Sequence, residues 1–256
     1  MKLRILLSYW YYKDTDLNAL FEKYFTPPYP DVFADSGGFS AMTQGAQIDV
    51  NEYAAWIKRY KHLFNTYANL DVIGNAGATL DNQHRLEDLG VEPIPVFHVN
   101  EDWTQLESYI ENYPYIALGG MVPYMRYTKK IMPWIIKAFK LAGDKSVFHG
   151  FGATSWEVIK DLPWYSVDST TWMAGHRYGA QFVFAKGRLF QARANVLRKY
   201  VTDLNLLGFT LKEAISATQG NMELSKQIAC ASVAKAEEYL QIKNPDFRIY
   251  MAGLES

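Results

Sequence analysis

The sequence predicts an α/β protein, a (β/α)8 barrel with extra C-terminal helices. Three observations favour this fold class. The chain has 256 residues, which is a usual length for one such barrel. Eight short apolar runs alternate for the most part with helix-like segments, at a spacing of roughly 30 residues. The runs are continuously apolar rather than alternating, as expected for parallel strands that are covered on both faces.

The strands are expected at these apolar runs. They cover residues 3–9, 31–35, 69–73, 93–98, 115–118, 146–149, 164–168 and 181–185. The chain shows no linker, low-complexity tract or repeat, so residues 1–256 are expected to form a single barrel domain, with 208–256 as a C-terminal helical extension. The alternative is an open doubly wound sheet. That fold would carry a Gly-rich nucleotide-binding turn after its first strand, where this chain has Ser8-Tyr9-Trp10.

Helices are expected between the strands, where capping residues and apolar faces mark them. Asp49 with Glu52 is typical of a capping box, and Tyr53, Ile57 and Tyr60 follow at helical spacing. Other expected helices cover residues 14–25, 82–89, 130–142, 187–207 and 222–242, and further ones begin at Asp102, Thr154 and Thr210.

The composition limits the class of protein. Hydrophobic residues make up 49% and charged residues 21%, so a large core can be buried. The net charge of −1 gives no general attraction to nucleic acid, and any such binding needs a local basic patch. Cys230 is the only cysteine, which excludes an internal disulfide or a Cys-rich zinc cluster and favours a reducing, cytoplasmic setting. We expect no signal peptide, membrane span, metal or cofactor.

Functional residues are expected at the carboxyl ends of the strands, where barrel enzymes place their sites. Read in order, these ends carry Asp35, Asp71, His98, Gly119, Gly120, His149, Gly150 and Asp168. Asp35 and Asp168 share a layout of strand, carboxylate, small polar residues and aromatic. We interpret them as facing each other across one active site. Alternatively, a single Asp at a strand end caps the next turn, and a lone His is a packing residue.

A pair of carboxylates suits chemistry at an acetal-like carbon. One carboxylate attacks the anomeric carbon and holds the sugar covalently, while the other moves protons for the departing or arriving group. This pattern favours enzymes that act on sugar–base or sugar–sugar bonds.

Four motifs resemble the tRNA-guanine transglycosylase family. Residues 33–39 (FADSGGF) look like its Asp-Ser-Gly-Gly-aromatic motif, and residues 116–121 (IALGGM) resemble its Gly-Gly strand exit. Residues 149–152 (HGFG) are similar to its Met-Gly-Val-Gly turn, and 167–169 (VDS) fall where the family has its nucleophilic Asp. The motifs occur in family order, and the resemblance covers about residues 30–190.

The resemblance implies a role for each matching residue. Asp168 would be the nucleophile and Asp35 the general acid/base for the base nitrogen. Phe39 would stack on the purine, and Asp71 would recognise the guanine edge. Gly119 and Gly120 would offer backbone donors to the base. From their position at the strand ends, His98, His149 and Gly150 are also expected to bind the substrate, although the family has a Gln where this chain has His98.

The departures from the family pattern bear on the substrate. With one cysteine the chain cannot form the three-Cys, one-His zinc site of the tRNA enzymes. The zinc-free arrangement with residues 167–172 (VDSTTW) looks more like the DNA-guanine transglycosylases of phages and bacterial genomic islands. These insert 7-deazaguanine derivatives into DNA. Phosphate contacts are expected from Arg177, Lys186 and Arg188, although charges on barrel helices are often only solvated.

The function predicted from the sequence is therefore exchange of guanine in DNA for a 7-deazapurine such as preQ0. A zinc-free enzyme acting on tRNA, a barrel glycosidase and a non-catalytic nucleic-acid-binding protein are the alternatives. The C-terminal helices could serve a homodimer interface or only cover the barrel. If the protein is phage-encoded, the resemblance implies the host cytoplasm as its location.

Overall fold

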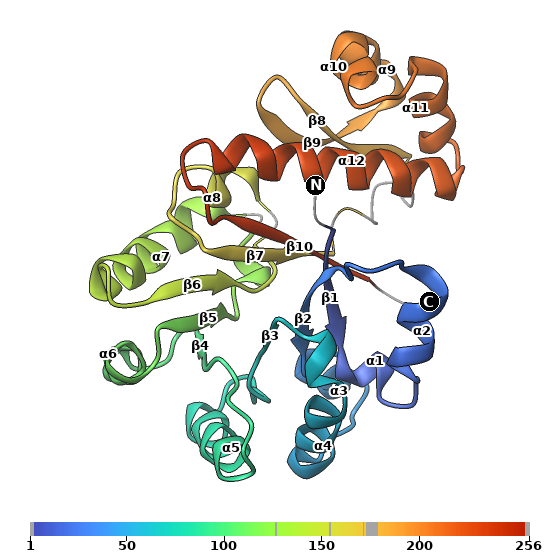
Figure 1. Ribbon diagram of the computed structural model, residues 1–256. Helices are drawn as coiled ribbons and strands as arrows, with labels where there is room; N and C mark the ends of the chain where they lie inside the picture. Colours follow the sequence, from blue (N-terminus) through green and yellow to red (C-terminus); the bar gives the residue numbers. More distant parts are fainter. Residues whose placement is uncertain (1–2, 126, 154, 171, 173–178, 254–256) are drawn as a thin grey trace.

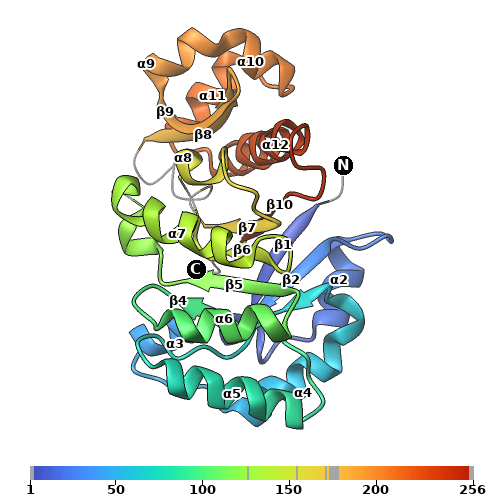
Figure 2. The same cartoon turned by 90° about the vertical axis from the view of Figure 1, so that its left-hand side faces the viewer.

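The computed structural model describes residues 3–125, 127–153, 155–170, 172 and 179–253 (Figure 1). Within them, eight parallel strands form one curled sheet with helices around it (Figures 1 and 2). In order across the sheet they are β3 (Thr66–Tyr67), β2 (Asp31–Asp35), β1 (Arg4–Ser8), β10 (Arg248–Ala252), β7 (Ser166–Ser169), β6 (Val147–Gly150), β5 (Tyr115–Gly119) and β4 (Val96–His98). The predicted α/β class is confirmed.

The helices follow the strands along the chain. Those around the sheet are α1 (Tyr9–Tyr12), α2 (Leu17–Tyr24), α3 (Gly38–Thr43), α4 (Val50–Tyr60), α5 (Ala76–Asp88), α6 (Trp103–Asn112), α7 (Thr128–Ala142) and α8 (Trp156–Ile159). Later in the chain come α9 (Ala194–Leu197), α10 (Val201–Leu206), α11 (Leu211–Thr218) and α12 (Met222–Gln241). Short 3₁₀ turns lie at Lys61–Leu63, Val122–Tyr124 and Arg198–Tyr200.

The predicted caps are largely present. The Asp49 carboxylate accepts hydrogen bonds from the backbone N–H groups of Asn51 and Glu52 at the start of α4. Thr210 and Glu213 form a complete capping box on α11. These contacts satisfy amide groups that the first turn of a helix leaves without partners, which fixes where each helix begins. Thr154, the expected start of the short helix, lies outside the described residues.

The curl of the sheet creates an apolar interior. One cluster of packed side chains draws on strands from across the whole sheet, and its members are Leu6, Phe33, Ala68, Val96, Ala117, Tyr250 and Ala252. The two end strands, β3 and β4, also approach each other. An isolated parallel bridge joins Ala68 to Ile94, and the Asn69 N–H donates to the Ile94 carbonyl at 3.0 Å.

The eighth strand of the sheet is not the predicted one. Residues 181–185 belong to β8 (Ala180–Ala185), which pairs with β9 (Arg188–Arg193) in a separate antiparallel hairpin. The position between β1 and β7 is taken by β10. Lys186 and Gly187 both have positive φ, 49° and 70°, and such a two-residue turn matches the twist of a hairpin. The predicted helix over residues 187–207 is therefore wrong in its first part.

The hairpin and the late helices form one accessory unit. Its core contains Val183, Ala192, Leu197, Leu204, Ala214, Ala217 and Ile228. Figures 1 and 2 show α12 lying between this unit and the curled sheet. The accessory unit therefore begins at β8 rather than at residue 208, and the expected helical extension ends in β10, a strand of the main sheet. The sequence pattern missed this because β8 and β10 are both short apolar runs.

The third strand also differs from its prediction. Residues 69–73 follow β3 instead of forming it. The side-chain amide of Asn69 donates to the Thr79 carbonyl at 2.8 Å, and that of Asn82 donates to the Leu70 carbonyl at 2.8 Å. These bonds tie the segment to α5. Asp71 therefore lies in the loop after β3, still on the carboxyl side of the sheet.

Candidate active site

Predicted site residues lie directly beyond the apolar interior, at the carboxyl ends of the strands. Residues two positions apart in a strand point to the same face. The interior residues Phe33, Val96 and Ala117 are followed two positions later by Asp35, His98 and Gly119. Asp168 follows Ser166 in the same way on β7. The alternation along each strand thus places the side chains of Asp35, His98 and Asp168, together with the backbone of Gly119, at one mouth.

Asp168 is a buried carboxylate held by a backbone donor. Its exposed fraction is 7%. The backbone N–H of Gly152 donates to its Oδ1 atom at 2.8 Å, and Nε2 of His149 lies 3.4 Å from the same oxygen. Gly152 has a φ of 61°, and a Cβ there would collide with Val122. The turn that presents this N–H to Asp168 therefore requires glycine.

His149 lies beneath Asp168 in the interior. Its ring stacks on Phe33 with centroids 4.2 Å apart, and Phe151 contacts it edge-on at 4.7 Å. Its Nδ1 atom is 2.5 Å from the Ser166 hydroxyl, which is 2.6 Å from the Tyr115 hydroxyl. Burial lowers the pKa of His149 more than the neighbouring Asp168 carboxylate raises it, so the imidazole is neutral at neutral pH.

Asp35 carries a strongly shifted pKa. Burial, followed by the negative charges of Asp71 and Asp168, raises the pKa of Asp35 from 3.8 to about 7, although backbone N–H groups of Gly37 and Ser36 oppose this. The Gly37 N–H donates to Oδ2 of Asp35 at 3.1 Å. Asp35 therefore exchanges a proton near neutral pH. Its electrostatic coupling to both other carboxylates supports a common site, as expected from the strand ends.

Asp71 is held by a buried histidine. Its Oδ2 atom lies 2.8 Å from Nε2 of His98, and Nδ1 of His98 lies 3.0 Å from Glu101. Burial alone would lower the pKa of His98, but the hydrogen bonds to Asp71 and Glu101 outweigh it and raise that pKa to about 9. His98 is consequently an imidazolium at neutral pH. The Ser36 hydroxyl lies 3.4 Å from the other Asp71 oxygen, Oδ1.

Several supporting residues were not predicted from the sequence. Glu101 also accepts the backbone N–H of His98 at 3.0 Å, and an acid three residues after a strand-end histidine is a signal that local sequence offers. Ser166 and Tyr115 offer no comparable signal, because they meet His149 only through the pairing of β5, β6 and β7.

Glycine is needed at the predicted positions for different structural reasons. A Cβ at Gly119 would lie 2.7 Å from Cδ2 of His98, and Gly120 has a φ of 72°, so both permit close packing at the mouth. Gly150 differs, since a Cβ there would lie 2.9 Å from the ring of Trp164, a residue of the core between sheet and helices. Gly150 therefore faces away from the mouth.

A cavity adjoins the site beside α3. It has a volume of about 400 Å³ and is lined by Gly38 and Asp71 together with apolar side chains such as Ile48 and Leu70. Phe39, the predicted stacking residue, lies at the start of α3 with 59% of its surface exposed. Its ring is free to meet a ligand at the rim.

The predicted phosphate-contacting residues do not gather at the mouth. Lys186 lies in the turn of the β8–β9 hairpin, and Arg188 is the first residue of β9. Gly187 of that turn lines a cavity with Lys160 and Lys243, which precede β7 and β10 and so lie on the amino side of the sheet. The expected position at the mouth depended on β8 being a sheet strand. Arg177 lies outside the described residues.

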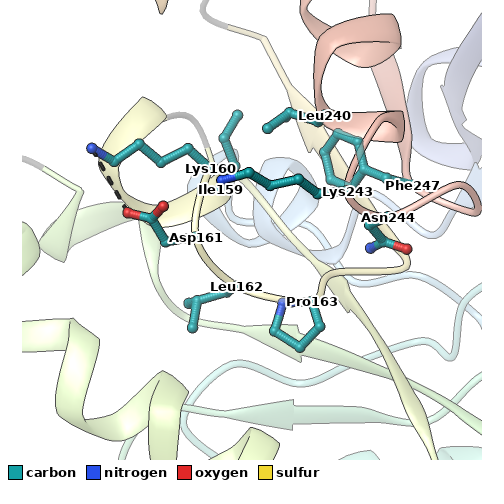
Figure 3. A pocket seen from close by; sticks show the side chains of 9 residues that line it. All are labelled: Ile159, Lys160, Asp161, Leu162, Pro163, Leu240, Lys243, Asn244 and Phe247. Atoms are coloured by element: carbon teal, nitrogen blue, oxygen red, sulfur yellow. Dashed lines mark ion pairs between the residues drawn. The ribbon is translucent and has the colours of Figure 1, made fainter.

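A second cavity on the amino side is shown in Figure 3. Its volume is about 240 Å³, and it is lined by Lys160 to Pro163 and by residues at and beyond the end of α12. The Lys160 ammonium lies 3.7 Å from Asp161 and 2.7 Å from Glu157. None of the predicted site residues lines this cavity.

Comparison of the sequence with models of protein families finds no match, and comparison with curated proteins finds none either. Among the described residues, none of the helices has the length and apolar character needed to cross a membrane. In the same part of the chain, no three His, Cys, Asp or Glu side chains gather as a set of metal ligands.

Proposed function

We propose that the protein is a closed (β/α)8-barrel transglycosylase that exchanges guanine in DNA for a 7-deazapurine such as preQ0. The observation that carries the proposal is the pair Asp35 and Asp168 at the mouth, one with a pKa of about 7 and the other buried on a backbone N–H. The Ala68–Ile94 bridge supports barrel closure. The resemblance of residues 33–39 and 167–169 to the tRNA-guanine transglycosylases points to the same chemistry.

The first half of the exchange removes guanine. The Asp168 carboxylate attacks C1′ of the deoxyribose, and the C1′–N9 bond breaks with its electron pair going to N9. Protonated Asp35 gives its proton to that nitrogen. Neutral guanine leaves, and a covalent deoxyribosyl–Asp168 ester remains.

The second half inserts the new base. Ionised Asp35 takes the N9 proton of the incoming 7-deazapurine, whose N9 electron pair then attacks C1′. The C1′–Asp168 bond breaks, and its electron pair returns to the carboxylate. A group that both gives and takes a proton works best with a pKa near the working pH, and the raised pKa of Asp35 meets that requirement.

Recognition of the base falls to residues around this pair. Asp71 accepts N–H groups on the guanine edge, and His98 fixes its orientation from the opposite side. Gly119 and Gly120 let the backbone approach the base, and the exposed ring of Phe39 stacks on it. A partly buried carboxylate that is already hydrogen-bonded binds a matching donor without reorganising.

DNA is favoured over tRNA because the chain cannot form the zinc site of the tRNA enzymes with Cys230 alone. A base within a duplex must be flipped out to reach a barrel mouth, whereas a base in a single strand is already accessible. Single-stranded DNA is therefore the preferred substrate in the proposed reaction.

Incorporation of radiolabelled guanine or preQ0 into single-stranded DNA, duplex DNA and tRNA, measured side by side, tests the proposal. The variants are wild type, Asp168→Asn and, as a matched control, Asp161→Asn, which removes a carboxylate far from the mouth. Label in DNA that is lost only in Asp168→Asn is expected. Label in tRNA alone would keep the chemistry and overturn the substrate. Absence of label from folded wild-type protein, with activity on glycosides, would favour a glycosidase.

A further inference from the structure

The two oxygens of Asp168 are in different surroundings. Oδ1 accepts the Gly152 N–H at 2.8 Å and is also the oxygen that Nε2 of His149 approaches, at 3.4 Å. Among the described residues, no hydrogen bond reaches Oδ2. One oxygen is therefore anchored and the other is left for a reacting group.

The hydrogen bonds around His149 determine which of its nitrogens carries the proton. The imidazole is neutral, so Nδ1 and Nε2 have one hydrogen between them. If the Tyr115 hydroxyl donates to Ser166 and the Ser166 hydroxyl donates to Nδ1, both hydroxyl hydrogens have an acceptor. Nε2 then carries the imidazole hydrogen. It faces Oδ1 of Asp168 at 3.4 Å without a hydrogen bond in this structure, so the contact is electrostatic.

The opposite direction of donation along these hydrogen bonds, from Nδ1 to Ser166 and from Ser166 to Tyr115, is unfavourable. With the hydrogen on Nδ1, the Ser166 hydroxyl would donate to Tyr115, whose own buried hydroxyl hydrogen would need another acceptor. The lone pair of Nε2 would also face an ionised carboxylate at 3.4 Å. A buried donor without an acceptor and two facing lone pairs both cost free energy.

We infer that Asp168 attacks through Oδ2, and that His149 is a positioning residue whose Nε2–H, set by Ser166 and Tyr115, holds Oδ1 away from the sugar. The inference rests on the proposed function, in which Asp168 is the nucleophile. The Oδ2 electron pair forms the bond to C1′ while the C1′–N9 pair leaves with guanine. Oδ1 becomes the carbonyl oxygen of the ester and keeps the Gly152 N–H donor, with Nε2–H of His149 facing it, and both stabilise the carboxylate when it leaves again.

Other groups facing His149 are consistent with this direction. Phe33 and Phe151 present apolar rings from β2 and from the turn after β6. Tyr250 on β10 contacts the imidazole with its ring, 6.2 Å between centroids, while its hydroxyl donates to Asp31. In the described part of the chain, Asp168 is thus the charged group that meets the imidazole.

The tautomer can be measured without activity. In intact wild-type protein with ¹⁵N-labelled histidine, NMR should show His149 with an unprotonated Nδ1 and a protonated Nε2. Ser166→Ala should weaken this preference. The matched control is Ser146→Ala, which removes another buried serine hydroxyl, one that donates to the Tyr113 carbonyl at 2.8 Å. A wild-type spectrum with the proton on Nδ1 would overturn the inference.

The kinetics of exchange separate positioning from folding. Without the Ser166 hydroxyl, Nε2–H is less firmly set toward Oδ1, so kcat should fall about 10-fold or more while KM stays near the wild-type value. Ser146→Ala should keep the wild-type kcat and KM. If Ser166→Ala and Ser146→Ala share the same kcat and KM while Asp168→Asn is inactive, the positioning role is wrong and the proposed function stands. If wild type exchanges no base, the proposed function itself fails.

Discussion

Nε2 of His98 lies 2.8 Å from Oδ2 of Asp71, and this partly buried ion pair joins the end of β4 to the loop after β3. Removal of the imidazolium leaves the partly buried carboxylates of Asp71 and Glu101 without their cation. We predict that His98→Leu lowers the free energy of unfolding by about 3 kcal/mol, because removing one member of an ion pair leaves the other as an unpaired charge. His98→Gln, which keeps one donor, should lose less. Urea denaturation of both variants checks this, and equal losses would contradict it.

The same pair predicts a pH dependence of stability. The pKa of His98 is raised from 6.5 to about 9 in the folded protein. The stability from this pairing is therefore complete below about pH 6.5 and is lost as the pH rises through about 9. Denaturation between about pH 6 and pH 10 should show this loss in wild type and a flatter curve in His98→Gln. Parallel curves would show that the imidazolium does not contribute.

Asp35 is expected to lower the stability of the folded protein while it supports base exchange. Its pKa is raised from 3.8 to about 7, so the folded state disfavours its ionised form, and the stability from Asp35 is lost as the pH rises through 7. Asp35→Asn removes that penalty and should stabilise the protein at about pH 8 by on the order of 2 kcal/mol. Base exchange should fall at least about 100-fold. A destabilised but active Asp35→Asn variant would contradict both roles.

The raised pKa of Asp35 also predicts the shape of the activity profile. Because the first half of the exchange needs protonated Asp35, kcat/KM for guanine removal should fall as the pH rises above about 7. The measurement is the pH dependence of release of labelled guanine from DNA. A rate that stays constant from about pH 7 to pH 9 would show that Asp35 is not the proton donor.

Gly37 should be the least replaceable glycine of the site. Its φ is 74°, and a Cβ would lie 2.6 Å from Cβ of Trp10. Gly90 has nearly the same φ, 73°, but no atom within 4 Å of the added Cβ. Gly37→Ala should therefore be less stable than Gly90→Ala by about 1–3 kcal/mol, the cost of overpacking alone. Equal unfolding free energies for the two variants would show that the neighbours of Gly37 move to accommodate the added methyl group.

The parts of the fold that the sequence predicts well are those whose signals are local. Residues 31–35 (DVFAD) hold an apolar run between two aspartates, and β2 has the predicted bounds. The Thr210–Glu213 pattern carries its own hydrogen bonds and needs no tertiary contact to be recognised. Because the strands are parallel, their carboxyl ends meet at one edge of the sheet, and this places Asp35, His98 and Asp168 together there.

The remaining features depend on contacts between distant residues. Residues 181–185 and 248–252 are both short apolar runs, and only pairing with β1 and β7 selects the second for the sheet. That choice also decides that Lys186 and Arg188 lie on the amino side. Likewise, Ser166 becomes a partner of His149 only because β6 and β7 lie side by side.

The most direct test of the central claim is detection of the covalent deoxyribosyl–Asp168 ester. Protein quenched in denaturant during reaction with single-stranded DNA should carry a DNA adduct that peptide mass spectrometry places on Asp168. Addition of guanine or preQ0 before the quench should discharge it, and Asp168→Asn should form none. An adduct that survives in Asp168→Asn, or its absence from wild type during active exchange, would contradict the mechanism.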